Sequence, residues 1–217
     1  MRRLVIVGAG GHGREALDIV RAINDSRPTF DFVGFLDDGR TPGSRAEPHD
    51  ARILGGVDRM ADLDAAMVVA VGATEARRRI VASLSGYPTV DLVHPLASIG
   101  SHVQHGPGLI MAAGARLTHG IVLGQHVHVN VNATVSHDCR IGSFVTITPG
   151  AHLSGSVTLG DRVWMGIGST AIQGVRVGAG TTVGAGAAVV DDLPPGCTAV
   201  GVPARPVKEV DREPSRR

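Results

Sequence analysis

Two different periods of hydrophobic residues divide the chain. In its first part, short apolar runs of strand length alternate with segments whose apolar residues recur at helical spacing. This alternation is typical of a parallel sheet covered by helices. It predicts a small Rossmann-like α/β domain over residues 1–95, with strands at 4–7, 32–36, 67–71 and 90–93 and helices at 14–24 and 75–84.

From Ile99 onward the pattern changes to a repeat of six residues. Every sixth residue from Ile99 to Val183 gives fifteen positions, and thirteen of them are Ile, Leu, Val or Met. The next residue is glycine in eight of the fifteen hexads, and Pro107 and Pro149 share one phase of the repeat. Such a period indicates a parallel β-helix. Three hexads make a coil of 18 residues, so we predict about five coils over residues 96–217, followed by a C-terminal tail.

Composition narrows the class of protein further. With 30 glycines and only 3% aromatic residues, the core must consist of small aliphatic side chains. A net charge of +1 gives no general electrostatic attraction to nucleic acid. Two cysteines form no disulfide framework, and no apolar run approaches the ~18 to 20 residues of a membrane span. We therefore expect a cytoplasmic protein without a nucleic-acid or membrane partner.

One histidine stands out when the coils are stacked by their 18-residue period. His119 and His137 then lie about one strand spacing (~4.8 Å) apart, and Gly155 takes the same position in the next coil. At a corner of the coil His137 can project outward, and Asp138 can fix its tautomer as for a general base. Cys139 occupies an inward phase, which predicts a core residue and not a nucleophile.

The other histidines of the repeat have weaker signals. We expect His102, His126 and His152 to be solvated polar residues at corners. His119 and His128 are expected to line a subunit interface.

A glycine-rich turn follows the first predicted strand and precedes the first predicted helix. Its free helix N–H groups are suited to phosphate, and Asp37 follows about two dozen residues later, as in a dinucleotide fingerprint. Four strands make only half of a dinucleotide-binding fold, however. Nucleotide-sugar binding, NAD(P) binding and a purely structural role all remain open for Gly8, Gly10, Gly11, His12, Gly13, Asp37 and Asp38.

The chain resembles a known family over almost its whole length. The segments that carry the resemblance are the glycine-rich turn, residues 35–38, Asn130 with residues 132–142, and the ending 199–205. They are similar to the two-domain sugar O- and N-acetyltransferases. These include the sialic acid O-acetyltransferases and the nucleotide-amino-sugar N-acetyltransferases of bacillosamine and perosamine synthesis. The resemblance implies a left-handed β-helix and a homotrimer with active sites between neighbouring subunits.

The same resemblance assigns roles to individual residues. It makes His137 the general base, with Asp138 in place of a more usual glutamate, and puts Asn130 near the acceptor or the thioester carbonyl. It places the glycine-rich turn at the diphosphate of a nucleotide-sugar, and the aspartate pair near its base or ribose. Acetyl-CoA is expected to contact Thr146, where some members carry a second histidine, and the backbone at Gly155, Ile167, Ala185 and Gly186.

The expected reaction is transfer of an acetyl group from acetyl-CoA to the amine of a nucleotide-linked amino sugar. O-acetylation of a sialic acid or another sugar is the nearest alternative. A zinc-dependent carbonic-anhydrase-like β-helix needs three histidines, and the repeat supplies only His119 and His137 at useful spacing, so no metal is expected. A non-catalytic nucleotide sensor is the remaining alternative.

Overall fold

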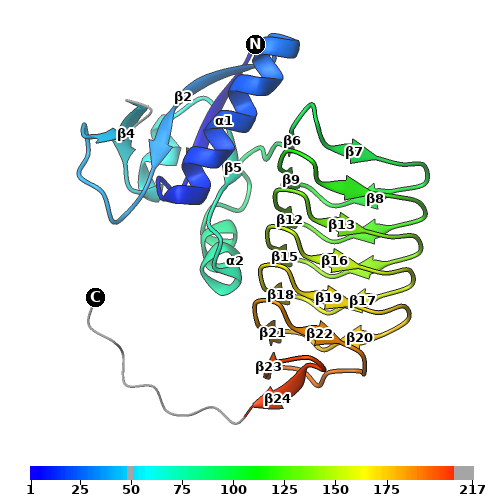
Figure 1. Cartoon of the computed structure of the whole chain (residues 1–217). Coiled ribbons are helices and arrows are strands. Elements are labelled where there is room, and N and C mark those ends of the chain that lie inside the picture. The colour runs from blue at the N-terminus through cyan, green and yellow to red at the C-terminus, as the bar shows by residue number, and fades with distance from the viewer. Residues whose placement is uncertain (48–50, 208–217) are drawn as a thin grey trace.

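The computed structural model describes residues 1–47 and 51–207. A small α/β domain lies beside a long β-helix, whose coils stack in one direction (Figure 1). The last ten residues of the predicted tail, 208–217, lie outside the described residues.

The α/β domain has a mostly parallel sheet with strand order β3-β4-β2-β1-β5. Strand β1 pairs in parallel with β2 on one side and with the edge strand β5 on the other, while the short β3 pairs antiparallel with β4. Apolar side chains of the first helix pack on one face of this sheet and those of the second helix on the other. The elements are β1 Arg2–Val7, α1 Gly11–Ser26, β2 Phe30–Leu36, β3 Arg45–Ala46, β4 Ala51–Gly55, the 3-10 helix Val57–Asp62, β5 Ala66–Val69 and α2 Thr74–Ser83.

The predicted helices and the first three predicted strands are confirmed, whereas the fourth strand was assigned to the wrong sheet. Leu92–Val93 (β6) pairs with Ile110–Met111 (β9), 18 residues further along the chain, and so belongs to the β-helix. Val93 is in phase with the hexad ladder, one step before Ile99. Strands β3 and β4 were not predicted. The division of the chain at residue 95 remains a prediction.

The β-helix is a triangular prism with three parallel sheets, which we call faces 1, 2 and 3. The pairing register is 18 residues along the repeat, for example between Arg116 and Thr134, and shortens to 16 residues at its end, between Thr182 and Thr198. Face 1 contains β7 Ser98–Ile99, β10 Arg116–Leu117, β13 Thr134–Val135, β16 His152–Leu153, β19 Thr170–Ala171 and β22 Ala188–Val189. Face 2 contains β8 Gln104–His105, β11 Val122–Leu123, β14 Arg140–Ile141, β17 Thr158–Leu159 and β20 Arg176–Val177. Face 3 contains β6, β9, β12 His128–Val129, β15 Thr146–Ile147, β18 Trp164–Met165, β21 Thr182–Val183, β23 Thr198–Val200 and the antiparallel β24 Arg205–Val207.

The ladder residues of the repeat form the core of the prism, as predicted. From Met111 to Val183 each of them is buried, and aliphatic or small side chains fill the space between the faces. Ile99 is 41% exposed because its strand, β7, is the end strand of face 1. Within the described residues faces 1, 2 and 3 hold six, five and eight strands, slightly more than about five coils require. No described helix has the length and apolar character needed to cross a membrane.

Candidate active site

His137 projects from the corner between faces 1 and 2, which we call corner 1/2. Its Nδ1 lies 2.8 Å from Oδ2 of Asp138, and both side chains are more than half exposed. Asp138 adopts a left-handed φ of 62°, which aspartate tolerates better than most residues, and its amide donates to the carbonyl of His119. A carboxylate only accepts hydrogen bonds, so Nδ1 carries the proton and Nε2 is left with its lone pair. This is the arrangement that a general base needs.

Gly155 lies directly beneath the ring of His137, as the 18-residue period predicted. A Cβ at this glycine would be 2.5 Å from Nε2 of His137. On the other side, His119 turns its Nδ1 toward Ser101 Oγ at 2.9 Å. The base is therefore seated over a position without a side chain.

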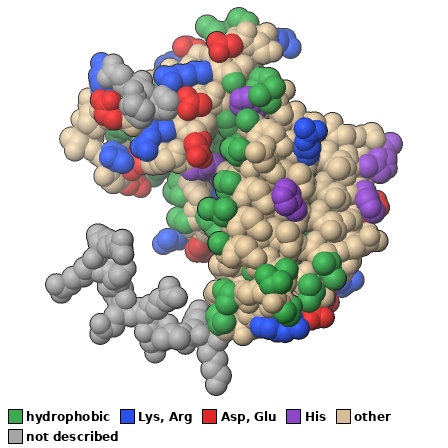
Figure 2. Space-filling model, in the orientation of Figure 1, with side chains coloured by type: hydrophobic (Ala, Val, Ile, Leu, Met, Phe, Trp, Pro, Cys, Tyr) green, Lys and Arg blue, Asp and Glu red, His purple; other side chains and the backbone are tan. Residues whose placement is uncertain are grey.

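The positions expected to hold the pantetheine arm divide between two corners. Gly155 belongs to corner 1/2, whereas Ile167, Ala185 and Gly186 lie at the corner between faces 3 and 1, corner 3/1. Ile167 is 61% exposed there, and the Gly186 amide donates to its carbonyl. Apolar side chains follow the edge of the β-helix nearest the α/β domain in Figure 2, while charged side chains gather on the α/β domain.

Asn130 also lies at corner 3/1 and not beside His137. Its side-chain amide donates to the carbonyl of Ile147 at 3.2 Å. It lines a cavity of about 180 Å³ together with His12, Glu15 and His94. Within one chain, the structure thus brings Asn130 to the glycine-rich turn and keeps it a full face away from the base.

Thr146 is part of the contact between the domains. Its side chain is 2% exposed, and its hydroxyl donates to the carbonyl of Gly72 while accepting from Arg77. The hydroxyl is thus occupied within the chain, and the structure does not bring Thr146 together with His137.

The glycine-rich turn contains glycines of two kinds. Gly8 has a φ of 102°, and a Cβ on Gly13 would collide with the Gly8 carbonyl, so the fold itself requires both. In contrast, a Cβ on Gly10 or Gly11 would meet nothing within 4 Å. Gly10 caps helix α1 without a side-chain partner. The absence of side chains at these two positions leaves the backbone open to close approach by a ligand.

The aspartate pair anchors loops at the edge of the sheet. Asp37 accepts from the amides of Ala9 at 2.7 Å and Gly39 at 2.9 Å, which ties the glycine-rich turn to the end of β2. Asp38 is exposed and accepts from the amide of Val57 at 2.8 Å.

A buried polar cluster between the domains was not predicted. Arg77 of α2 and His128 of β12 are both fully buried, and His128 contacts His12 of the glycine-rich turn. The expectation that His128 lines a subunit interface was therefore wrong, because the chain's own α/β domain covers it. Burial, and then the charge of Arg77, hold the pKa of His128 well below its ordinary value.

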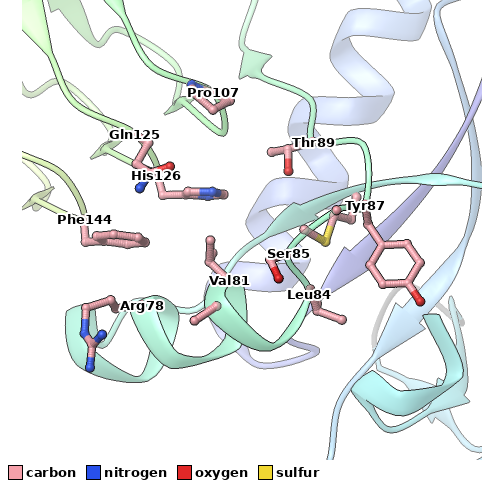
Figure 3. Close-up of a pocket in the computed structure, with 13 residues that line it drawn as sticks. Arg78, Val81, Leu84, Ser85, Tyr87, Thr89, Pro107, Gln125, His126 and Phe144 are labelled. Atoms are coloured by element: carbon pink, nitrogen blue, oxygen red, sulfur yellow. The ribbon is translucent and has the colours of Figure 1, made fainter. Parts of the chain in front are cut away.

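His126 is likewise buried and not solvated. Its ring stacks on that of Phe144, with centroids 5.5 Å apart, and burial lowers its pKa to about 4. Both rings border a cavity of about 470 Å³ between the end of α2 and the β-helix (Figure 3). None of the predicted site residues lines this cavity.

The remaining candidate groups have no place at the site. Cys139 is fully buried, and burial raises the pKa of its thiol, which confirms that it is a core residue. Across residues 1–47 and 51–207, no three His, Cys, Asp or Glu side chains group closely enough to hold a metal ion.

The chain is similar to several known proteins. Residues 3–84 match the PglD N-terminal domain family. GDP-perosamine N-acetyltransferase of Escherichia coli O157:H7 is 30% identical over 143 residues, which cover 65% of this chain and 65% of that protein. The acetyltransferase domain of PglB from Neisseria gonorrhoeae FA1090, solved with acetyl coenzyme A, is 36% identical with a TM-score of 0.84, over 95% of this chain and 99% of that one.

A second similar structure contains a nucleotide-sugar. PerB from Caulobacter crescentus, in complex with CoA and GDP-perosamine, is 30% identical with a TM-score of 0.83, over 94% of this chain and 97% of that one. Three observations indicate the same family: the PglD-type domain, the hexapeptide β-helix and the matches along nearly the whole chain. The chain belongs to the hexapeptide-repeat sugar acetyltransferases.

Proposed function

We propose that this protein transfers an acetyl group from acetyl-CoA to the amine of a nucleotide-linked amino sugar. The observation that carries the proposal is the geometry of His137. Asp138 binds its Nδ1, and its Nε2 lies over Gly155 with no side chain in the way. The relatives that act on perosamine or bind acetyl coenzyme A support both substrates.

The reaction follows from this arrangement. As the sugar amine attacks the thioester carbonyl, Nε2 of His137 takes the proton that the nitrogen loses. The tetrahedral intermediate then collapses, the C–S bond breaks, and the proton passes to the departing sulfur to give free CoA and an amide. Asp138 stabilises the imidazolium that forms between these steps.

The acceptor side is assigned to the glycine-rich turn and the start of α1. Gly10 and Gly11 leave the helix N-terminus accessible, where free N–H groups favour the diphosphate of a nucleotide-sugar. Asp38 is exposed at the adjacent loop and is suited to the ribose or base, while Asp37 shapes the turn. Asn130 lines the cavity next to this turn, consistent with a contact to the sugar.

The donor side is assigned to the corners of the β-helix. Gly155 at corner 1/2 and Ile167, Ala185 and Gly186 at corner 3/1 are suited to the pantetheine arm, because small side chains and free backbone groups allow close approach. Thr146 is left out of this proposal, because its hydroxyl is buried and bound by the α/β domain.

The protein acts as a homotrimer with its active sites between subunits. The support is the split of the site in one chain: His137 lies at corner 1/2, whereas Asn130 and the exposed Ile167 lie at corner 3/1. Packing corner 1/2 of one copy against corner 3/1 of the next, around a threefold axis, brings the two halves together. A cytoplasmic location is part of the proposal, and its support is the two free cysteines together with the use of acetyl-CoA.

Mixing two inactive variants tests the shared site. His137→Ala removes the base, and Ala185→Trp fills corner 3/1, so each homotrimer should be inactive. If sites lie between subunits, random mixed trimers regain intact sites in about one quarter of positions. No recovery, or a solution mass of one chain, would refute the shared site.

Release of free thiol tests the reaction itself. With acetyl-CoA and a panel of nucleotide-4-amino-sugars, we expect turnover with at least one acceptor, reduced at least ~100-fold in His137→Ala. Panel members with a hydroxyl in place of the amine distinguish O-acetylation. Unchanged turnover in His137→Ala would remove the base from the proposal.

A further inference from the structure

Three polar residues line corner 1/2 on the N-terminal side of His137 and take no part in the reaction described so far. Ser101 and His119 occupy the same position as His137 in the two preceding coils, and His102 follows Ser101. All three are exposed. Hydroxyl and imidazole groups can both donate and accept hydrogen bonds, which suits them to the hydroxyl groups of a sugar.

The ring of His119 is oriented by two neighbours. Its Nδ1 lies 2.9 Å from Oγ of Ser101, and the ring of His102 packs against it edge to face with centroids 5.2 Å apart. Nε2, at the tip of the ring, has no hydrogen-bond partner in the part of the chain that the structure describes. The Ser101 hydroxyl can donate to Nδ1 or accept from it, so Nε2 can accept or donate in turn. Either tautomer of His119 can therefore bind a hydroxyl group.

The rings of His119 and His137 turn in opposite directions along the β-helix. His119 turns toward Ser101 in the preceding coil, whereas His137 lies over Gly155 in the following coil. Their own coils are only about one strand spacing (~4.8 Å) apart. Because the two rings turn away from each other, the corner stays open between them.

The acceptor cavity lies at the same level of the β-helix as this part of corner 1/2. From three successive coils it is lined by His94, Ala112 and Asn130. These residues lie seven positions before, respectively, Ser101, His119 and His137. Rotation about a threefold axis along the β-helix keeps each coil at its own height. In the proposed trimer, the acceptor cavity of one copy therefore faces His119 and His137 of the next.

The positions assigned to acetyl-CoA lie at a different level. Ile167 and Gly186 of corner 3/1 belong to coils that come after Gly155. The same rotation thus places the pantetheine arm on the C-terminal side of His137, and the acceptor sugar on the side of His119.

We propose that His119, oriented by Ser101, binds the acceptor sugar through the hydroxyl next to the reacting amine and so helps to select the acceptor. This inference rests on the proposed function. The amine lies at Nε2 of His137, and the hydroxyl on the adjacent ring carbon points to Nε2 of His119. Two neighbouring substituents of a sugar ring, with one hydrogen bond at each outer side, span the open corner between the two histidines.

Removal of the sugar hydroxyl tests the contact directly. With the best acceptor among the nucleotide-4-amino-sugars, we expect His119→Ala to lower kcat/KM about 5- to 10-fold, in line with one hydrogen bond. The KM for acetyl-CoA should stay within about twofold. The 3-deoxy analogue of that acceptor lacks the hydroxyl next to the amine, so the parent and His119→Ala should use it equally well. Equal losses with the two acceptors would overturn the proposal.

Two further variants separate this contact from a general effect of truncating side chains at corner 1/2. Ser101→Ala removes one support of the His119 ring, and we expect kcat/KM to fall about threefold with the hydroxyl-bearing acceptor only. Gln173→Ala is the matched control, because Gln173 is exposed at the same position two coils beyond His137. It should stay within about twofold with both acceptors. A loss in Gln173→Ala equal to that in His119→Ala would also overturn the proposal.

A binding measurement keeps this inference separate from acetyl transfer. Calorimetry in the His137→Ala background compares GDP- and UDP-linked 4-amino sugars with GDP and UDP alone. Adding His119→Ala should weaken binding of the nucleotide-sugar about 5-fold and leave that of the free nucleotide unchanged. Equal changes for both ligands, or no change for either, would overturn the inference and leave the proposed function intact if the parent turns over. Absence of both turnover and nucleotide-sugar binding would overturn the two together.

Discussion

Replacing Gly155 by alanine should disable the base without unfolding the protein. The same position of corner 1/2 is occupied by His119 and His137 in the two preceding coils and by Gln173 in the next. The backbone there thus accepts side chains, and only the ring of His137 forbids one at Gly155.

The size of the effect follows from the overlap. A Cβ at Gly155 would lie 2.5 Å from Nε2 and 3.0 Å from Nδ1 of His137, where ordinary contacts begin at 3.4 Å. The ring must therefore move by about 1 Å, and a misplacement of that size in an active site costs about 100-fold in rate. Because the His137 side chain is 53% exposed, it can rotate toward solvent, and the melting temperature should change little.

Thiol release from acetyl-CoA measures this loss, and a double variant identifies its cause. Gly155→Ala should lower kcat/KM about 100-fold in the parent but much less in His137→Ala, where the displaced ring is absent and only an effect on the pantetheine arm remains. Gln173→Ala, one coil further on the same corner, should stay within about twofold as a control. Full activity in Gly155→Ala, or an equal loss on top of His137→Ala, would refute the idea that the glycine exists to seat this ring.

Three further outcomes are expected. Asp138→Asn keeps the size of the side chain but can present an amide N–H to Nδ1; it should lower kcat about 10- to 100-fold with KM for acetyl-CoA unchanged, and equal kcat in both proteins would contradict the role of the carboxylate. His126 has a pKa of about 4 in the folded protein, below its ordinary 6.5, so the unfolded chain binds the proton first as the pH falls. The free energy of unfolding should therefore decrease by about 2 kcal/mol between pH 6.5 and pH 4. Urea unfolding at several pH values should show a weaker dependence of this free energy on pH in His126→Phe, and an unchanged dependence would exclude His126 as its source. A thiol reagent should label Cys197 but not Cys139 in the native protein, because Cys139 is fully buried, and labelling of both would contradict that burial.

Features of the site that depend only on the six-residue repeat could be predicted from the sequence. One ladder residue per hexad is enough to place His137 over Gly155 and Cys139 in the core, because every coil repeats the same geometry. The same period also separates Asn130 from His137, which are seven residues apart and thus on successive corners. That consequence was available from the spacing alone.

Contacts between the domains were not predictable in this way. An arginine in a short helix and a histidine in the repeat carry no mark that α2 will dock on face 3 and bury Arg77 against His128. For the same reason the repeat alone predicts a solvated corner residue at position 126, whereas His126 is buried. The sheet of the strand at Leu92–Val93 was predicted wrongly for another reason: an apolar run of strand length does not specify the strand with which it pairs.

In the function proposed above, the two substrates bind to different parts of the chain. On face 3, His128 lies under the domain and contacts His12, while Asn130, two residues later, lines the cavity beside it. Ile167 and Ala185 lie further along corner 3/1, in coils that make none of these contacts. Changes at the buried Arg77 contact should therefore alter recognition of the nucleotide-sugar before recognition of acetyl-CoA. An arrangement of this kind would allow the acceptor to change within a family, through the α/β domain and its docking, while the coils proposed to bind the thioester stay the same.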